Sequence, residues 1–201
     1  MQRKYSFLFS DELLFDDAYE YYMRFLREPF VEECVISYTK KDENIEKLAY
    51  KEYPQDTSVV NNSSICFEID YKGTPLLFLG DKSVDSLDMN LIKEKYALLK
   101  VPHHGSNNNY SVEFARKVQA EIYMISTNGK KYRHPDKGTV AKIICYNKAD
   151  KKIIFNYNKL PVFDFLNGIE LSKYNVRIQK PDDQESMVIN IEGEAQWNFE
   201  N

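Results

Sequence analysis

The residues best suited to chemistry are three histidines and one aspartate that stand in short loops. His103 and His104 are neighbours, His134 lies further along the chain, and Asp81 precedes all three. They come after apolar segments that are predicted to be strands, and α/β sheets bind ligands beyond the carboxyl ends of their strands. Imidazole and carboxylate groups are ligands of Zn²⁺ and Mn²⁺. The sequence therefore predicts that an acid and imidazoles from neighbouring strand ends lie at the edge of the sheet where ligands bind.

Taken singly, each of these features also has an ordinary structural interpretation. Asp81 after a glycine is typical of a turn that leads into a helix cap, and His134 before a proline is typical of a turn. Two adjacent histidines are not by themselves a metal site. The basic residues around His134 indicate either a solvated surface or a rim that binds a phosphate oxyanion; they are Lys130, Lys131, Arg133 and Lys137.

Five segments carry a more specific signal when they are taken together. They are Asn61-Asn62-Ser63-Ser64-Ile65, Phe78-Leu79-Gly80-Asp81, Leu99-Lys100-Val101-Pro102-His103-His104-Gly105-Ser106, Ser126-Thr127-Asn128-Gly129 and Tyr132-Arg133-His134-Pro135. In order and spacing this set resembles the C-terminal half of a metallo-β-lactamase-fold hydrolase of the subgroup related to the ComEC DNA-uptake (competence) proteins. The resemblance covers residues 55–157. It implies an α/β fold of the αββα sandwich type.

The resemblance also implies roles for individual residues. Asp81 would bridge two divalent metal ions, Zn or Mn, and His104 would bind one of them. Asp81, His103 and His134 would be the catalytic residues, with His103 either behind the metal ligands or in contact with the substrate. Ser106, Lys131, Arg133 and His134 would bind the substrate. The implied activity is nuclease-type hydrolysis of a phosphodiester in nucleic acid or a nucleotide, in which bridged ions activate water and stabilise an in-line displacement at phosphorus.

The chain departs from this family in one respect. The family carries an HxHxDH motif in its N-terminal half that supplies most of the metal ligands, whereas this chain has no histidine before His103. A metal site needs at least three well-placed protein ligands. Three explanations stay open: a fragment of a larger hydrolase, a subunit completed by a partner that carries the missing half, or a non-catalytic binding or scaffold protein. A half-fold should also expose an apolar sheet face.

The hydrophobic pattern predicts the elements that would position these residues. Residues 55–201 read as the C-terminal lobe, and residues 1–54 as an N-terminal helix and strand followed by a linker or insertion. In the lobe we expect strands at 65–71, 75–79, 97–101, 121–126, 152–156 and 187–191, and helices at 86–96, 111–119 and 138–147. Before it we expect a strand at 5–9, a helix at 16–27, a strand at 31–38 and a polar, exposed segment at 39–62. The apolar segment 161–171 should pack on something.

Composition excludes several classes of protein. The chain has 201 residues, enough for one domain or one large lobe, and its net charge of −4 gives no overall basic footprint for nucleic acid. Three cysteines, far apart, favour reduced thiols in the cytoplasm over a disulfide framework. No apolar run is long enough to cross a membrane, so we expect a soluble, cytoplasmic protein.

Overall fold

A mixed six-stranded sheet organises the chain. This computed structural model describes residues 44–182 and residue 189, which all belong to one compact unit, Tyr38–Asn201. The strands follow one another across the sheet in sequence order. Strand β1 is antiparallel to β2, and every later neighbour is parallel. The strands are β1 (Phe67–Tyr71), β2 (Thr74–Phe78), β3 (Lys95–Lys100), β4 (Gln119–Ile125), β5 (Lys151–Phe155) and β6 (Val176–Gln179).

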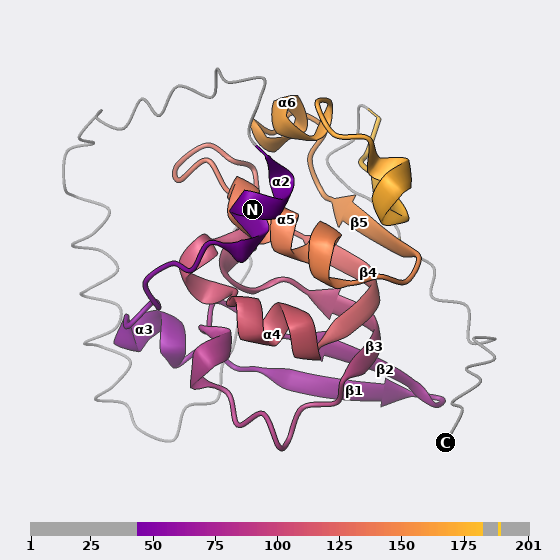
Figure 1. Cartoon of the computed structure of the whole chain (residues 1–201). Helices are drawn as coiled ribbons and strands as arrows, with labels where there is room; N and C mark the ends of the chain where they lie inside the picture. Colours follow the sequence, from indigo (N-terminus) through magenta and orange to yellow (C-terminus); the bar gives the residue numbers. More distant parts are fainter. Residues whose placement is uncertain (1–43, 183–188, 190–201) are drawn as a thin grey trace, which may run out of the picture. The chain divides into compact units, whose positions relative to one another are not determined.

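Helices cover one face of this sheet. Because the parallel strands progress in one direction, each right-handed crossover places its connection on the same face. Figure 1 shows α4 and α5 lying in front of the strands, and α2 packs on α5. The helices are α2 (Ile45–Tyr50), α3 (Val59–Asn62), α4 (Val112–Lys117), α5 (Lys137–Tyr146) and α6 (Val162–Leu166). Short 3-10 turns are η1 (Val84–Ser86), η2 (Pro102–Gly105), η3 (Asn107–Asn109) and η4 (Leu171–Tyr174).

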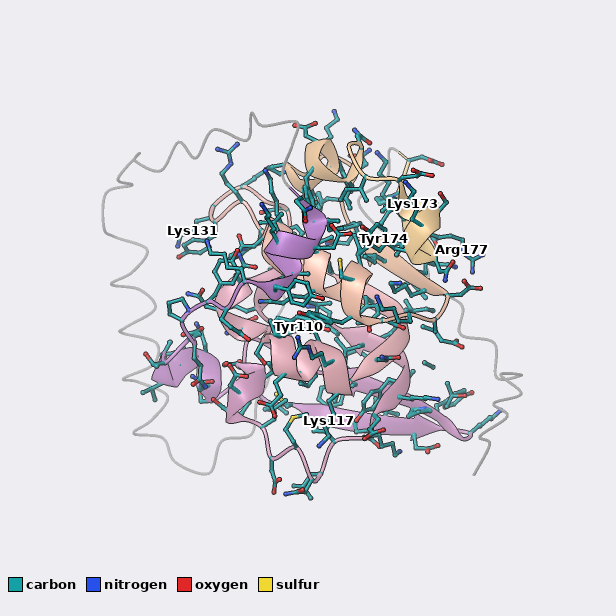
Figure 2. The ribbon with its side chains drawn as sticks, in the orientation of Figure 1. Tyr110, Lys117, Lys131, Lys173, Tyr174 and Arg177 are labelled. Carbon is teal, nitrogen blue, oxygen red and sulfur yellow. The ribbon has the colours of Figure 1, made fainter. Side chains whose placement is uncertain are left out.

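The hydrophobic core lies between the sheet and these helices. Leu77, Leu99 and Tyr123 come from three neighbouring strands and are fully buried. Tyr110 and Phe114 meet edge to face, with ring centroids 5.5 Å apart, and Figure 2 shows Tyr110 in the interior of the domain. Burying large apolar and aromatic side chains stabilises such a domain by about 1.5–3 kcal/mol for each side chain. The strand ends that carry the candidate site therefore stand on a rigid support.

Most of the predicted elements in the described part of the chain are present. The hairpin, the three following strands and the helices at 111–119 and 138–147 are confirmed to within about two residues. The helix predicted at 86–96 is wrong, because this segment forms η1 and turns before β3 begins at Lys95. The side chain of Asp88 accepts a hydrogen bond from the backbone N–H of Asn90 at 3.0 Å. Such local bonds compete with helix formation.

Other parts differ from the sequence prediction. The segment 39–62 is not wholly exposed, since it contains α2 and α3 and buries Ile45 and Ala49. Because α2 packs on α5, the predicted boundary after residue 54 falls inside the compact unit. Strand β6 was not predicted, whereas segment 161–171 does pack, through buried Val162 and Leu166 of α6. The elements predicted at 5–9, 16–27, 31–38 and 187–191 lie outside the described residues, apart from residue 189.

Strand β1 exposes three large apolar side chains. Phe67, Ile69 and Tyr71 alternate along β1 and are 45%, 41% and 53% exposed. Phe67 lies opposite Phe78 of β2, and their rings stack with centroids 4.9 Å apart. Alternate residues of a strand share one face of the sheet. This face is therefore apolar near β1 and open to solvent.

No helix among residues 44–182 has the length and apolar character that crossing a bilayer requires.

Lys151 is expected to stabilise the junction between α5, β5 and β6. Its side chain is buried, and Nζ donates to the backbone oxygens of Asn147 at 2.7 Å and Tyr174 at 2.6 Å. Lys151→Met keeps most of the volume but leaves both carbonyls without a donor, so we expect a loss of about 1–2 kcal/mol in the free energy of unfolding. Urea denaturation checks this. The half-buried neighbour Lys152 is the matched control, and Lys152→Met should change stability by less than about 0.5 kcal/mol; an equal effect of both variants would contradict the prediction.

Candidate active site at the strand ends

The predicted chemical residues converge where parallel strands end. Asp81 follows β2, His103 and His104 follow β3, and Ser126 follows β4. The Nε2 atom of His104 lies 3.9 Å from Oδ1 of Asp81. The ring of His103 lies 6.1 Å from that of His104, measured between centroids. The predicted meeting of an acid and an imidazole from neighbouring strands is confirmed, and Asp81 does not begin a helix, since Ser83 precedes η1.

The two histidines occupy an unusual backbone conformation. In η2, His103 has φ 41° and His104 has φ 56°, and Gly105 follows with φ 89°. Left-handed backbone at a residue with a side chain costs about 1–3 kcal/mol. Backbone hydrogen bonds hold the turn: the His103 N–H donates to the oxygen of Gly80 at 2.9 Å, and the Ser106 N–H donates to the oxygen of His103 at 3.0 Å. This turn presents both imidazoles at the same edge of the sheet.

The backbone carbonyl of Ser126, the residue after β4, fixes the position of one proton on His104. Its Nδ1 lies 2.5 Å from the backbone oxygen of Ser126. Because a carbonyl oxygen only accepts hydrogen bonds, Nδ1 must carry the proton. In the neutral imidazole the lone pair is therefore on Nε2, the atom that faces Asp81. The side chains of His104 and Asp81 are 48% and 44% exposed, so both can be reached from solvent.

His103 belongs to a polar network that the sequence did not reveal. Its Nδ1 lies 3.0 Å from Oδ1 of Asn109 and 3.3 Å from Oδ2 of Asp56. Burial raises the pKa of the Asp56 carboxyl, but hydrogen bonds from Asn109 and from the N–H of Ser58 outweigh this effect, so the pKa lies below its usual range. Asp56 is therefore a carboxylate at neutral pH, and it lies in a polar segment where no motif marks it.

His134 joins the cluster from the loop before α5. Its ring centroid lies 5.8 Å from that of His103, and its side chain is 14% exposed. Its Nδ1 is buried and makes no hydrogen bond, although Oδ1 of Asp136 lies 3.4 Å away. Asp136 also ties the two loops together, because its N–H donates to the oxygen of Gly105 at 3.0 Å. The three histidines therefore form one cluster.

The other predicted substrate-binding residues are placed differently. Ser106 is buried, and its hydroxyl accepts a hydrogen bond from the N–H of Asn108 at 3.2 Å, so it stabilises η3. Lys131 and Arg133 are exposed on the loop before His134, and Figure 2 shows Lys131 at the periphery of the domain.

Lys100 is a basic residue near the site that the sequence did not mark. It lies close enough to Asp81 for their charges to interact. Burial lowers the pKa of Lys100, and the charge of Asp81 opposes this shift.

The donors in the described part of the chain do not complete a metal site. Asp81 and His104 fit a divalent ion as two ligands, because their facing atoms are 3.9 Å apart and Zn–N and Zn–O bonds are about 2.0–2.2 Å long. Among residues 44–182, however, no group of three or more His, Cys, Asp or Glu side chains could hold an ion. The arrangement therefore supplies two donors of a set that needs at least three.

Gly105 is expected to be required for the contact between the two histidine loops. A Cβ at this position would lie 2.5 Å from Cβ of Pro135, and its φ of +89° disfavours any other residue. Gly105→Ala should therefore destabilise the domain by about 1–2 kcal/mol and move His134 away from His103. Urea denaturation and the histidine ring signals in NMR spectra measure both effects. Gly168→Ala is the control, since its nearest neighbour would be 3.5 Å away; equal stability of both variants would contradict the prediction.

Comparison with known proteins does not assign a family. No protein-family model matches the chain, and no curated protein or solved structure matches it significantly.

Proposed function

We propose that this chain is the C-terminal lobe of a metallo-β-lactamase-like αββα sandwich and supplies part of a metal-dependent site that hydrolyses phosphodiesters in nucleic acid or nucleotides. The observation that carries the proposal is the pair Asp81 and His104. A carboxylate and an imidazole lone pair face each other across 3.9 Å at the ends of parallel strands, and both are open to solvent. A divalent ion held there would polarise a phosphoryl oxygen and activate water.

The surrounding residues suit an anionic substrate. The second imidazole, His103, is held by Asn109 beside this pair. Lys131 and Arg133 are exposed on the loop that leads to His134 and can meet phosphate oxygens by charge-assisted hydrogen bonds. The chain is acidic as a whole, with a net charge of −4, so attraction of a phosphodiester depends on such local basic residues.

The sheet suits the proposed sandwich as well. Helices α4 and α5 cover one face, whereas the side chains of Phe67, Ile69 and Tyr71 leave part of the other face apolar and exposed. Parallel sheets occur almost only with both faces covered. A second lobe packed on that face would bury these side chains and bring the remaining ligands to the strand ends.

Metal analysis and hydrolysis assays on the full chain test the proposal. The genes or reading frames adjacent to this one are first searched for a product with the HxHxDH motif, and any such protein is co-expressed with the chain. We expect the complex to retain Zn or Mn in stoichiometric amounts and to cleave bis(p-nitrophenyl) phosphate or single-stranded DNA or RNA. Asp81→Ala should abolish both properties, and the exposed Asp85 of η1 supplies the control, Asp85→Ala.

A different result would favour the non-catalytic alternative. If the chain stays free of metal and inert in the presence of added Zn²⁺ or Mn²⁺ and of a partner with the motif, the hydrolase proposal is wrong. A binding or scaffold role would then be the better account of the same fold.

A further inference from the structure

Asn109 connects the imidazole of His103 with the carboxylate of Asp56 and the backbone carbonyl of Asp81. It is 1% exposed, so its amide must find partners inside the protein. Its Nδ2 donates to Oδ2 of Asp56 at 2.9 Å and to the backbone oxygen of Asp81 at 3.0 Å. Its Oδ1 lies 3.0 Å from Nδ1 of His103. Three groups thus meet at one amide: the carboxylate of Asp56, the backbone carbonyl of Asp81 and the imidazole of His103.

The chemistry of these groups fixes the orientation of the Asn109 amide and places a proton on Nδ1 of His103. The carboxylate of Asp56 and the carbonyl of Asp81 can only accept hydrogen bonds, so the NH₂ end of Asn109 must face them. Its oxygen must then face His103, and since this oxygen only accepts, Nδ1 of His103 must be the donor. A neutral imidazole carries one proton. In the neutral ring the lone pair of His103 is therefore on Nε2.

Asp56 is itself held in place by hydrogen bonds, and the series of hydrogen bonds that leads through Asn109 to His103 begins at its carboxylate. Its Oδ1 accepts from the N–H of Ser58 at 2.9 Å, and its Oδ2 accepts from Nδ2 of Asn61 at 2.7 Å. Its own N–H donates to the backbone oxygen of Asn108 at 2.9 Å, which ties it to the turn that carries Asn109. The Asp56 side chain is 14% exposed. Every contact of its carboxylate is one in which oxygen accepts.

We propose that Asp56 is a positioning residue that acts on His103 through Asn109 and through its own Oδ2, which lies 3.3 Å from Nδ1 of His103. It keeps the proton of His103 on Nδ1, so that Nε2 accepts a hydrogen bond from the attacking water or the substrate. The role of His103 rests on the proposed hydrolytic function, whereas the tautomer follows from the network alone. Groups that orient an imidazole in this way are worth about 10- to 100-fold in activity or affinity at comparable sites.

NMR of the ring nitrogens tests the inference in the full chain. The chain has only three histidines, so ¹⁵N-histidine labelling gives three ring systems, and His103→Gln assigns the one of interest. Long-range ¹H–¹⁵N correlation at about pH 8, above the usual imidazole pKa of about 6.5, should show the proton of His103 on Nδ1. In Asp56→Asn an NH₂ group replaces one accepting oxygen, so Asn109 should turn over and His103 should shift toward the Nε2–H tautomer.

The control and the fallback variant keep the outcome clear. Asp164→Asn, at an exposed position of α6, should leave the His103 tautomer unchanged. If Asp56→Asn does not fold, Asp56→Ser takes its place, because serine keeps an acceptor for the N–H of Ser58. A wild-type His103 protonated on Nε2, or a tautomer unchanged in a folded Asp56 variant, would overturn the inference.

Activity measurements separate this inference from the proposed function. In an active complex, Asp56→Asn should lower kcat by about 10- to 100-fold with a smaller change in KM. A shifted tautomer with unchanged kcat would overturn the catalytic part of the inference. If wild type neither binds metal nor hydrolyses a phosphodiester while Asp56→Asn still shifts the tautomer, the proposed function fails and the positioning role of Asp56 stands.

Discussion

Replacing Asp81 by alanine is expected to remove the cation-binding capacity of the strand-end site. Asp81 supplies one of two facing donors, and the other, Nε2 of His104, lies 3.9 Å from its carboxylate. A contact with a charged partner is worth about 1.5–3 kcal/mol, so affinity should fall about 10- to 100-fold. In this variant Lys100 would also lose the negative charge of Asp81, which favours its ammonium form. The pKa of Lys100 should therefore fall further.

Paramagnetic broadening by Mn²⁺ measures this effect in the full chain, even for a weak site. Substoichiometric Mn²⁺ should broaden the ring signals of His104 before those of distant residues, and the broadening should disappear in Asp81→Ala. Asp85→Ala, an exposed position in the following turn, should retain it. Equal broadening of His104 in wild type and Asp81→Ala would show that the carboxylate of Asp81 takes no part in cation binding.

The convergence of Asp81 with the histidines could be predicted because it depends on a general property of sheets. Each residue follows a continuous apolar segment, and the ends of parallel neighbouring strands lie at one edge. The register then brings Phe78 of β2 beside Lys100 of β3, so the loops that follow them meet. The distance between Asp81 and His104 is thus a consequence of two short loops after paired strand ends.

The network around His103 could not be predicted for the opposite reason. Asp56 and Asn109 are 53 residues apart in sequence, and Asp56 stands in a polar segment with no hydrophobic period. Their contact depends on how the segment before α3 lies against η3, which is set by a backbone hydrogen bond from Asp56 to Asn108. Neither residue type is unusual in a loop, so only the folded geometry marks them.

The wrong helix at 86–96 shows where hydrophobic spacing misleads. Leu87, Leu91 and Ile92 stand at helical spacing, yet Leu91 is 78% exposed. Asp88 instead closes a local turn with Asn90. Short polar side chains that bond nearby backbone outweigh a weak helical period of this length.

Replacing Asn109 by alanine is expected to cause the largest loss of stability among the variants considered. The change leaves the backbone oxygen of Asp81 without its donor and Nδ1 of His103 without its closest acceptor. It also removes one of the two amide donors to Oδ2 of Asp56, the other being Nδ2 of Asn61. Each of the two groups left without its partner costs about 1–3 kcal/mol, and relaxation toward solvent recovers part of this, so we expect a loss of about 2–4 kcal/mol in the free energy of unfolding. Urea denaturation gives the value.

The neighbouring asparagine provides a matched control for this prediction. Asn108 is exposed and contributes to the network through its backbone, which accepts from the N–H of Asp56 at 2.9 Å. Asn108→Ala should therefore change stability by less than about 0.5 kcal/mol. If Asn109→Ala is as stable as Asn108→Ala, the buried amide does not hold the loops together. Loss of the Asn109 amide should also change the chemical shifts of the His103 and His104 ring signals in NMR spectra. The reason is that this amide joins the loop after β2 to the histidine turn after β3.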